Sequence, residues 1–222
     1  GTFGILGNIV NTLYIIVITL IIATPIGIGA AVYLTEYAKP GKIVSLIEFT
    51  TETLAGIPSI IYGLFGMVFF GISLHLGYSI LCGSLTLTLM VLPIIIRTTQ
   101  EALKTVPLGY RTGALGIGAT KWYMIRTIIL PSAMPGIVTA VILSVGRIVG
   151  ESAALLFTAG SAYLLPKNLF SHVLTSGGTL TIQMYLSMSK ADYGNAFAIA
   201  LVLIVVVLAI NALTKVATKK LS

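Results

Sequence analysis

The chain has 222 residues, of which 57% are hydrophobic and only 9% are charged. Soluble domains carry roughly 25% charged residues, so this composition excludes a water-soluble globular domain and predicts a multi-span helical membrane protein. The net charge of +7 comes without the aromatic–basic interleaving typical of RNA or DNA binding, so no nucleic-acid partner is expected. Cys82 is the only cysteine, which excludes a disulfide or a thiolate metal cluster within the chain.

Five stretches are apolar enough to cross a bilayer, which takes about 20 residues per helix. They predict one all-α transmembrane domain over residues 1–222, with spans at about 9–34, 57–76, 78–96, 133–157 and 196–213. In the first span Ala23, Gly27 and Ala31 recur every four residues, and such small side chains allow another helix to approach closely. A short amphipathic helix is expected at 43–54, between the first two spans.

Two polar segments separate the later spans. The loop 97–132 is basic and patterned like one or two short surface helices, so we expect another protein to bind it. Pro131 and Pro135 are predicted to end this loop and to start the fourth span. The segment 158–195 holds two moderately apolar pieces, neither long enough to span, and is expected to contribute to a docking surface outside the cell.

The distribution of Lys and Arg predicts the orientation, because cytoplasmic loops are enriched in these residues. With the loop 97–132 inside, ten basic residues lie on the cytoplasmic side and two lie outside. The ten are Lys39, Lys42, Arg97, Lys104, Arg111, Lys121, Arg126, Lys215, Lys219 and Lys220, and the two are Lys167 and Lys190. The C-terminus is then cytoplasmic and residue 1 external, and we expect a further span to precede it.

Arg147 lies inside the fourth predicted span, where an arginine costs about 2.5–3.5 kcal/mol to insert. Glu151 is one helical turn further on and is expected to pair with it. One interpretation is a self-neutralised structural pair. The other is that Arg147 lines an anion path, because a guanidinium offers a planar fork of donors to an oxyanion and Glu151 would weaken its grip on the ion.

Chemistry of other kinds finds no support in the sequence. No Ser, His and Asp combination forms a plausible triad, and 116–121 lacks the spacing of a nucleotide-binding GxxxxGK[ST] loop. His75 and His172 are expected to be isolated residues without metal-ligand spacing. We therefore expect no catalytic residues, no metal site and no enzymatic activity in this chain.

The loop nevertheless carries a family pattern. Gly118 is followed, after nine residues, by Ile128, one further residue, and Leu130-Pro131. This resembles the cytoplasmic loop of the permeases of binding-protein-dependent ABC importers. In that family the loop forms a coupling helix seated in a groove of the ATPase subunit. The resemblance implies that the residues in contact with the ATPase are Arg111, Ala114, Leu115, Gly118, Ala119, Thr120 and Lys121. The Glu-Ala-Ala that opens the family pattern is replaced here by Thr112-Gly113-Ala114.

Four further segments are similar to the phosphate-specific importer permeases, and the residues after Glu151 look more like the PstA type than its PstC-type partner. They are Leu54–Gly66, Arg97–Leu103, Gly150–Ala154 and Thr181–Tyr185. The resemblance implies a type I (MetI-like) permease of six helices, five of them here, in a bacterial or archaeal cell membrane. It places Arg147 and Glu151 on the phosphate path.

The same resemblance implies the partners and leaves alternatives open. The partners would be a second permease of PstC type, two ATPase subunits that bind ATP and Mg, an external phosphate-binding protein, and membrane lipid. This chain itself would hold no cofactor. One alternative is the same architecture carrying another oxyanion, such as molybdate or sulfate. A secondary transporter or channel is the other alternative, but it gives no reason for the pattern from Gly118 to Pro131.

Overall fold

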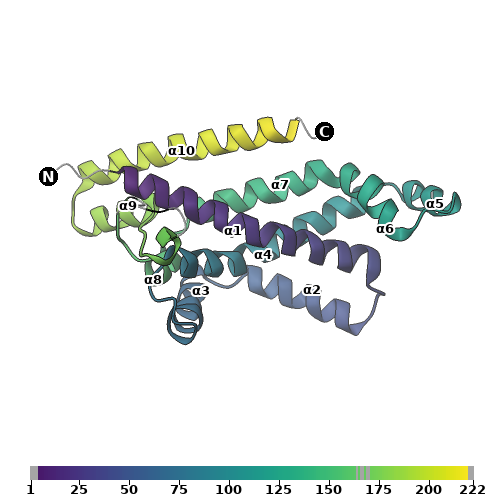
Figure 1. Cartoon of the computed structure of the whole chain (residues 1–222), viewed down its shortest axis with the longest axis horizontal. Coiled ribbons are helices and arrows are strands. Elements are labelled where there is room, and N and C mark those ends of the chain that lie inside the picture. The colour runs from purple at the N-terminus through teal and green to yellow at the C-terminus, as the bar shows by residue number, and fades with distance from the viewer. Residues whose placement is uncertain (1–4, 164, 166–167, 169–170, 220–222) are drawn as a thin grey trace.

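The computed structural model describes residues 5–163, 165, 168 and 171–219, with side chains given as far as Leu213 (Figure 1). Every regular element in this part of the chain is helical, as predicted. The elements are α1 (Leu6–Val32), η1 (Tyr33–Tyr37), α2 (Lys42–Ala55), α3 (Ser59–Gly66), η2 (Met67–Ser73), α4 (Ile80–Thr105), α5 (Leu108–Gly116), α6 (Lys121–Met124), η3 (Ile125–Ile129), α7 (Leu130–Val149), α8 (Ala153–Thr158), η4 (Ser171–Leu174), α9 (Leu180–Ser189) and α10 (Tyr193–Lys219).

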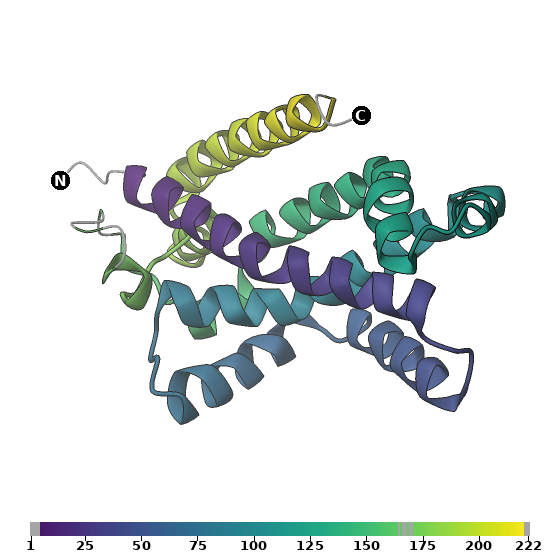
Figure 2. The same cartoon turned by 45° about the vertical axis from the view of Figure 1, so that its right-hand side comes forward.

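Four helical stretches are long and apolar enough to cross a membrane: Leu6–Tyr37, Ile80–Thr105, Lys121–Val149 and Tyr193–Leu213. A fifth span is possible only as a broken one, because α2 and the α3–η2 helix meet at a bend of 101°. Pro58, with its extended backbone, stands at this bend as the N-cap of α3. Figure 2 shows the two arms diverging below α4.

The core forms where α1 packs along α4. Ala23, Gly27 and Ala31 are all buried, as their spacing predicted. A Cβ at Gly27 would lie 2.5 Å from the Cγ2 of Ile95 on α4, so the two backbones approach too closely for a larger residue. The small side chains of α1 therefore fix the position of α4, and α7 packs against both helices.

Two predicted boundaries are wrong. The third stretch does not end at 96, because α4 continues to Thr105 and carries Arg97 within the helix. The helix that leads into α7 begins at Lys121, so the polar loop shrinks from 97–132 to 106–120. Pro131 stands in the first turn of α7, as predicted, and α7 continues directly from the π-helix η3, where the hydrogen-bond spacing changes and a missing N–H is tolerated.

The fourth predicted span, 133–157, is also two elements rather than one. The helix α7 ends at Val149, and α8 begins separately at Ala153. In Figure 1, α7 stops partway along α1, well before the α9 end of the molecule. The break between α7 and α8 therefore lies partway along α1 and not at the α9 end of the molecule.

Different elements of the structure lie at the two ends of the molecule. In Figures 1 and 2, η1, α5 and α6 gather at one end, which we call the α5 end, and the C-terminal end of α10 points toward it but stops above α7. The N-terminal end of α1, the start of α4 and the segment from α8 to α9 gather at the other, which we call the α9 end. Lys167 and Lys220, two of the residues counted for the orientation, lie outside the described residues.

Candidate functional site

Specific hydrogen bonds fix the break between α7 and α8. The N–H of Gly150 closes α7 by donating to the Gly146 carbonyl, and the chain then leaves the helix. The side chain of Glu151 is buried, and its Oε1 accepts a hydrogen bond from the N–H of Ala154 at 3.0 Å. An anionic oxygen at this position satisfies an orphan donor at the start of α8. Glu151 therefore caps α8 and orients it.

The expected ion pair between Arg147 and Glu151 is not formed. The sequence placed both residues on one helix face, but α7 ends at Val149, so Glu151 is no longer one turn along the same helix. Arg147 is exposed, and among the described residues its guanidinium has neither an ion pair nor a hydrogen bond. The described group within its electrostatic reach is the Tyr62 side chain on α3. The charge of Arg147 is therefore available to something outside this chain.

Three of the four sequence segments that resemble phosphate permeases converge beside this break. They supply residues to one cavity of about 170 Å³ between α3, α8 and α9. Ile60 comes from the segment Leu54–Gly66, Ser152 and Ala153 come from Gly150–Ala154, and Ile182 and Tyr185 come from Thr181–Tyr185. Segments more than 120 residues apart thus meet at one place. Packing between α3 and α8 brings this about.

Thr181 fastens α9 to the same break. Its hydroxyl donates to the backbone carbonyl of Glu151 at 3.0 Å and lies 2.9 Å from the hydroxyl of Thr179. Sequence reasoning quoted Thr181 only as part of a family segment, and it gave Tyr62 no role of its own. No spacing rule could pair Thr181 with Glu151, because the bond bridges 30 residues and depends on how α9 returns to α7.

Three buried polar side chains, Asn8, Asn11 and His172, hold the segment before α9 against α1 by hydrogen bonds. Asn11 donates to the carbonyls of Ala162 and Gly178, and its Oδ1 lies 2.7 Å from the Nε2 of His172. Because the amide nitrogen of Asn11 is the donor, His172 must carry its proton on Nε2. Asn8 donates to the same Gly178 carbonyl at 2.9 Å.

His172 is therefore not the isolated residue that the sequence suggested. It is 5% exposed, packs edge-on against Tyr14 and contacts the Thr175 hydroxyl through Nδ1. Burial lowers the pKa of His172 from its ordinary value of 6.5, because the charged imidazolium loses its hydration. The described residues include no group of three or more His, Cys, Asp or Glu side chains arranged to hold a metal ion.

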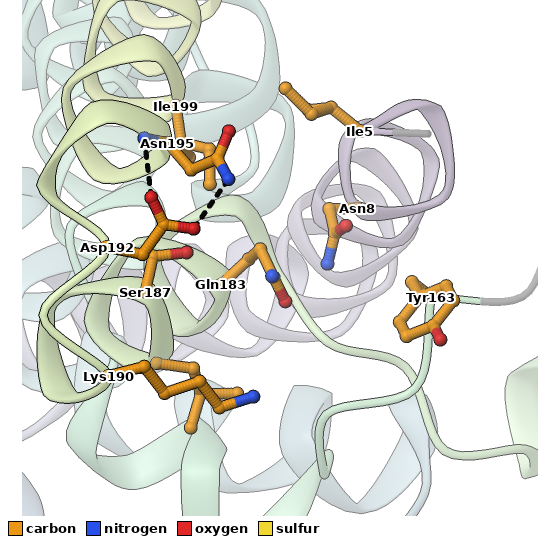
Figure 3. Close-up of a pocket in the computed structure, with 10 residues that line it drawn as sticks. Ile5, Asn8, Tyr163, Gln183, Ser187, Lys190, Asp192, Asn195 and Ile199 are labelled. Carbon is orange, nitrogen blue, oxygen red and sulfur yellow. Dashed lines mark hydrogen bonds between the residues drawn. The ribbon is translucent and has the colours of Figure 1, made fainter. Parts of the chain in front are cut away.

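A polar pocket of about 180 Å³ lies nearby, between the start of α1, α9 and α10 (Figure 3). Asp192 accepts hydrogen bonds from the backbone N–H and the side-chain amide of Asn195, and so caps α10. Lys190 and Gln183 reach toward the opening from α9 and its end (Figure 3). Arg147 and Glu151 do not line this pocket, so it is separate from the α7–α8 break.

At the α5 end, two of the predicted ATPase contacts are turned inward. Arg111 forms an ion pair with Glu36 at 2.8 Å and also donates to the carbonyls of Leu103 and Val106. Lys121 places its Nζ 5.0 Å from the centre of the Tyr37 ring. Both cations are therefore engaged by this chain itself.

The other predicted contacts shape the turn after α5. Ala114 is buried, Ala119 is half-buried, and Leu115 is exposed. Gly118 has φ +86°, which a residue with a side chain adopts only with strain, and this explains the glycine of the family pattern. Thr120 caps α6 by accepting from the N–H of Tyr123 at 3.3 Å.

The exposed face of this loop is apolar, which the sequence reasoning missed. Ile117 is 88% exposed and Leu108 is 72% exposed. Tyr110, Trp122 and Tyr123 are also more than half exposed. Large apolar side chains in an otherwise basic loop were the available signal. Several large exposed side chains in one loop are typical of an interaction surface.

The four apolar spans and the exposed apolar side chains of the α5 loop define a multi-pass helical membrane protein with a candidate interaction loop at one end. The comparisons with known proteins agree. The model of the family "Binding-protein-dependent transport system inner membrane component" matches residues 23–222. The chain belongs to this family, and the resemblance read from its loop is confirmed.

Curated relatives narrow the placement within the family. The chain is 41% identical over 157 residues to "Probable ABC transporter permease protein YqgI" of Bacillus subtilis, which covers 71% of this chain and 53% of that protein. It is 33% identical over 208 residues to "Phosphate transport system permease protein PstA 1" of Mycobacterium tuberculosis, covering 94% of this chain and 68% of that protein. The predicted similarity to PstA-type permeases is thus confirmed, and the chain spans about half the length of the YqgI protein.

Solved structures confirm the MetI-like fold. The chain matches the inward-facing MetNI methionine ABC transporter with a TM-score of 0.72 at 21% identity, covering 99% of this chain and 94% of that one. At this identity the likeness concerns the fold alone. The permease architecture expected from the sequence is therefore present.

Proposed function

We propose that this chain is the membrane-spanning permease subunit of an ATP-driven importer of inorganic phosphate and forms half of the translocation path. The observation that carries the proposal is the free guanidinium of Arg147 beside the α7–α8 break. An unneutralised arginine late in an apolar helix is expensive unless it meets an anion or a partner.

The chemistry of Arg147 suits a tetrahedral oxyanion. Its planar fork can donate two parallel hydrogen bonds to phosphate oxygens. Glu151 has no part in neutralising it, since its carboxylate caps α8. The role of Glu151 on the path is therefore to set the position of α8 and of the cavity that the three converging segments line.

Phosphate is preferred over other oxyanions because of the relatives. The Mycobacterium tuberculosis relative named as a phosphate transport permease aligns over 94% of this chain. Molybdate or sulfate would use the same guanidinium chemistry and are the competing substrates. A channel or secondary transporter would leave the exposed apolar face of the α5 loop without a purpose.

The proposed partners follow from the family and the loop. A second permease of PstC type would complete the path, and two ATPase subunits would bind ATP and Mg outside this chain. The apolar patch of Ile117, Leu108 and Trp122 would seat in an ATPase groove. An external phosphate-binding protein would deliver the ion at the α9 end, which places the α5 end and the C-terminus in the cytoplasm, in agreement with the basic residues.

In this mechanism ATP-driven closure of the ATPases displaces α5, and the helices rock between inward-open and outward-open arrangements. Phosphate entering from the α9 end meets Arg147 at the break. The ion is released when the rocking motion opens the path toward the α5 end. Coupling requires that Arg147 be open to a different side of the membrane in each state, while its hydrogen bonding to phosphate stays the same.

The test is labelled-phosphate uptake by cells that lack this gene and are rescued with the wild type, Arg147→Gln or Arg126→Gln. Arg126 is an exposed arginine without a partner among the described residues and serves as the matched control. We expect Arg147→Gln to lower uptake about 100-fold, since two charge-assisted hydrogen bonds are lost, while Arg126→Gln stays near the wild type. Sulfate and molybdate should not compete.

Two results would overturn parts of this proposal. Wild-type rescue that restores no phosphate uptake would refute the substrate and direct the assay to other oxyanions. Normal uptake by a correctly inserted Arg147→Gln chain would remove Arg147 from the path.

A further inference from the structure

The end of α1 and the two sides of the α5 loop meet in one small cluster. Glu36 and Tyr37 are consecutive residues of the π-helix η1. Glu36 pairs with Arg111 of α5, and the Tyr37 ring contacts Lys121 at the start of α6. We propose that this cluster is the mechanical link through which displacement of α5 moves α1, and that Arg111 is a positioning residue for coupling and not a contact with the ATPase. The inference rests on the proposed transport function.

The first argument is that α5 is otherwise loosely attached. Ala114 is its only buried residue, and it sits in an apolar cluster with residues at the ends of α1 and α4. The remaining side chains of α5 other than Arg111 are exposed. A push on the exposed face would therefore tilt α5 about Ala114 unless a second attachment carries the force inward.

Arg111 provides that attachment with all three of its guanidinium nitrogens. Nε and Nη2 donate to the carboxylate of Glu36 at 3.1 and 2.8 Å. Nη1 and Nη2 donate at 2.8 Å to the carbonyls of Val106 and Leu103, at the C-terminal end of α4. One side chain thus joins α5 to two membrane helices, and four of its five N–H donors are used within this chain.

Burial makes this link stiff. The Glu36 side chain is 5% exposed and that of Arg111 is 17% exposed, so solvent screens the pair far less than a surface pair. A bidentate guanidinium–carboxylate contact also fixes orientation as well as distance. The pair therefore transmits rotation of α5, which a single flexible contact would not.

The receiving element is suited to the role. The π-turn η1 continues α1 directly, and π-turns inside helices occur frequently at functional sites. Lys121 over Tyr37 adds a second, weaker attachment from α6 to the same turn. Since α1 packs along α4 and contacts α7, its movement reaches the helix that carries Arg147.

The test uses the assembled transporter in proteoliposomes with internal ATP, and the variants are Arg111→Gln, Glu36→Gln, the double variant, Arg111→Lys and the control Arg126→Gln. Four quantities are measured: retention of the ATPase on purification, ATP hydrolysis, phosphate uptake per ATP, and the ATP-dependent spectral change of a spin label at Lys39→Cys. Lys39 is exposed and follows η1, and the native Cys82 is buried from the label.

We expect Arg111→Gln and Glu36→Gln to retain the ATPase and to hydrolyse ATP within about twofold of the wild type. Uptake per ATP and the spectral change should each fall about tenfold, within the usual range of coupling between sites. The double variant should be no worse than either single one, because both remove the same link. Arg111→Lys keeps the positive charge but not the bidentate geometry. Its uptake per ATP and spectral change should therefore lie between those of the wild type and Arg111→Gln.

A merely structural role would lower hydrolysis and uptake together with the amount of folded complex, and would leave their ratio unchanged. Loss of the ATPase from Arg111→Gln but not from Glu36→Gln would make Arg111 a docking contact and overturn the inference. So would a normal spectral change in both single variants. If the wild type moves no phosphate, the proposed substrate fails, while the spectral change still decides the link.

Discussion

Arg111 lies in the short surface helix α5 and Arg147 near the end of the apolar helix α7, and the bonding of the two arginines is opposite. Arg111 has all three guanidinium nitrogens bonded to groups of this chain, including the Glu36 carboxylate. Arg147 is exposed and has neither a hydrogen bond nor an ion pair among the described residues. The first arginine is part of the scaffold at the α5 end, and the second has no partner among the described residues of this chain.

The comparison shows that the role of a charge depends on where its partners are. Removing Arg111 would leave a buried carboxylate without its partner, which lowers stability. An unpaired arginine near the end of an apolar helix is itself costly, so replacing Arg147 should not lower stability. We therefore expect a loss of stability only at Arg111, although both replacements should lower transport.

The largest expected effect on stability breaks the scaffold pair. Arg111→Gln should lower the free energy of unfolding by about 3 kcal/mol, the low end for a buried pair, since Arg111 keeps 17% exposure. Arg147→Gln should leave stability unchanged or slightly raised. Thermal unfolding of the purified complex in detergent measures both, with Arg126→Gln as the control. Equal losses for Arg111→Gln and Arg147→Gln would erase the distinction between the two arginines.

Glu151 gives a smaller effect that separates capping from charge. Glu151→Ala removes the acceptor for the Ala154 N–H and should cost about 1–2 kcal/mol, as for other lost helix caps. Glu151→Gln keeps an oxygen in the same place and should lose less than half of that. The melting temperatures of the two variants provide the measurement. A Gln variant as unstable as the Ala variant would show that the negative charge, and not the hydrogen bond, holds α8.

The buried polar cluster of Asn8, Asn11 and His172 at the α9 end should make the stability of the protein depend on pH, because His172 is titratable. Its folded pKa is lowered below 6.5 by burial, so below pH 6.5 the unfolded chain binds protons before the folded chain does. Stability should be level above that pH and fall as pH decreases, by at most about 1.4 kcal/mol per unit. Melting temperature between pH 7.5 and 5 provides the measurement. His172→Gln should flatten the slope, whereas the exposed His75→Asn should leave it intact.

A third arginine should give the smallest effect. Arg97 pairs with Glu52 at 2.7 Å, but the two side chains are 51% and 61% exposed. Arg97→Gln should therefore change the melting temperature the least, and high salt should weaken the wild-type pair to a similar degree. Melting curves at low and high salt test this. A loss as large as that of Arg111→Gln would mean that burial does not explain the ranking of the arginines.

The sequence alone determined the class and much of the plan. Composition required membrane helices, the spacing of Ala23, Gly27 and Ala31 predicted close approach of another helix, which the structure identifies as α4, and the pattern ending at Pro131 led to the family. These are properties of local spacing and of apolar runs long enough to span a bilayer. They are written within single helices or loops, so no knowledge of distant neighbours was needed.

Only the tertiary structure decided the partners of the charges. Arg111 meets Glu36 across 75 residues, and His172 meets Asn11 across 161. The separation of Glu151 from Arg147 follows from the end of α7 at Val149, which Gly150 and the return of Thr181 on α9 hold in place. A charge finds its partner by proximity in the folded bundle, and proximity across the bundle is set by helix packing and not by distance along the chain.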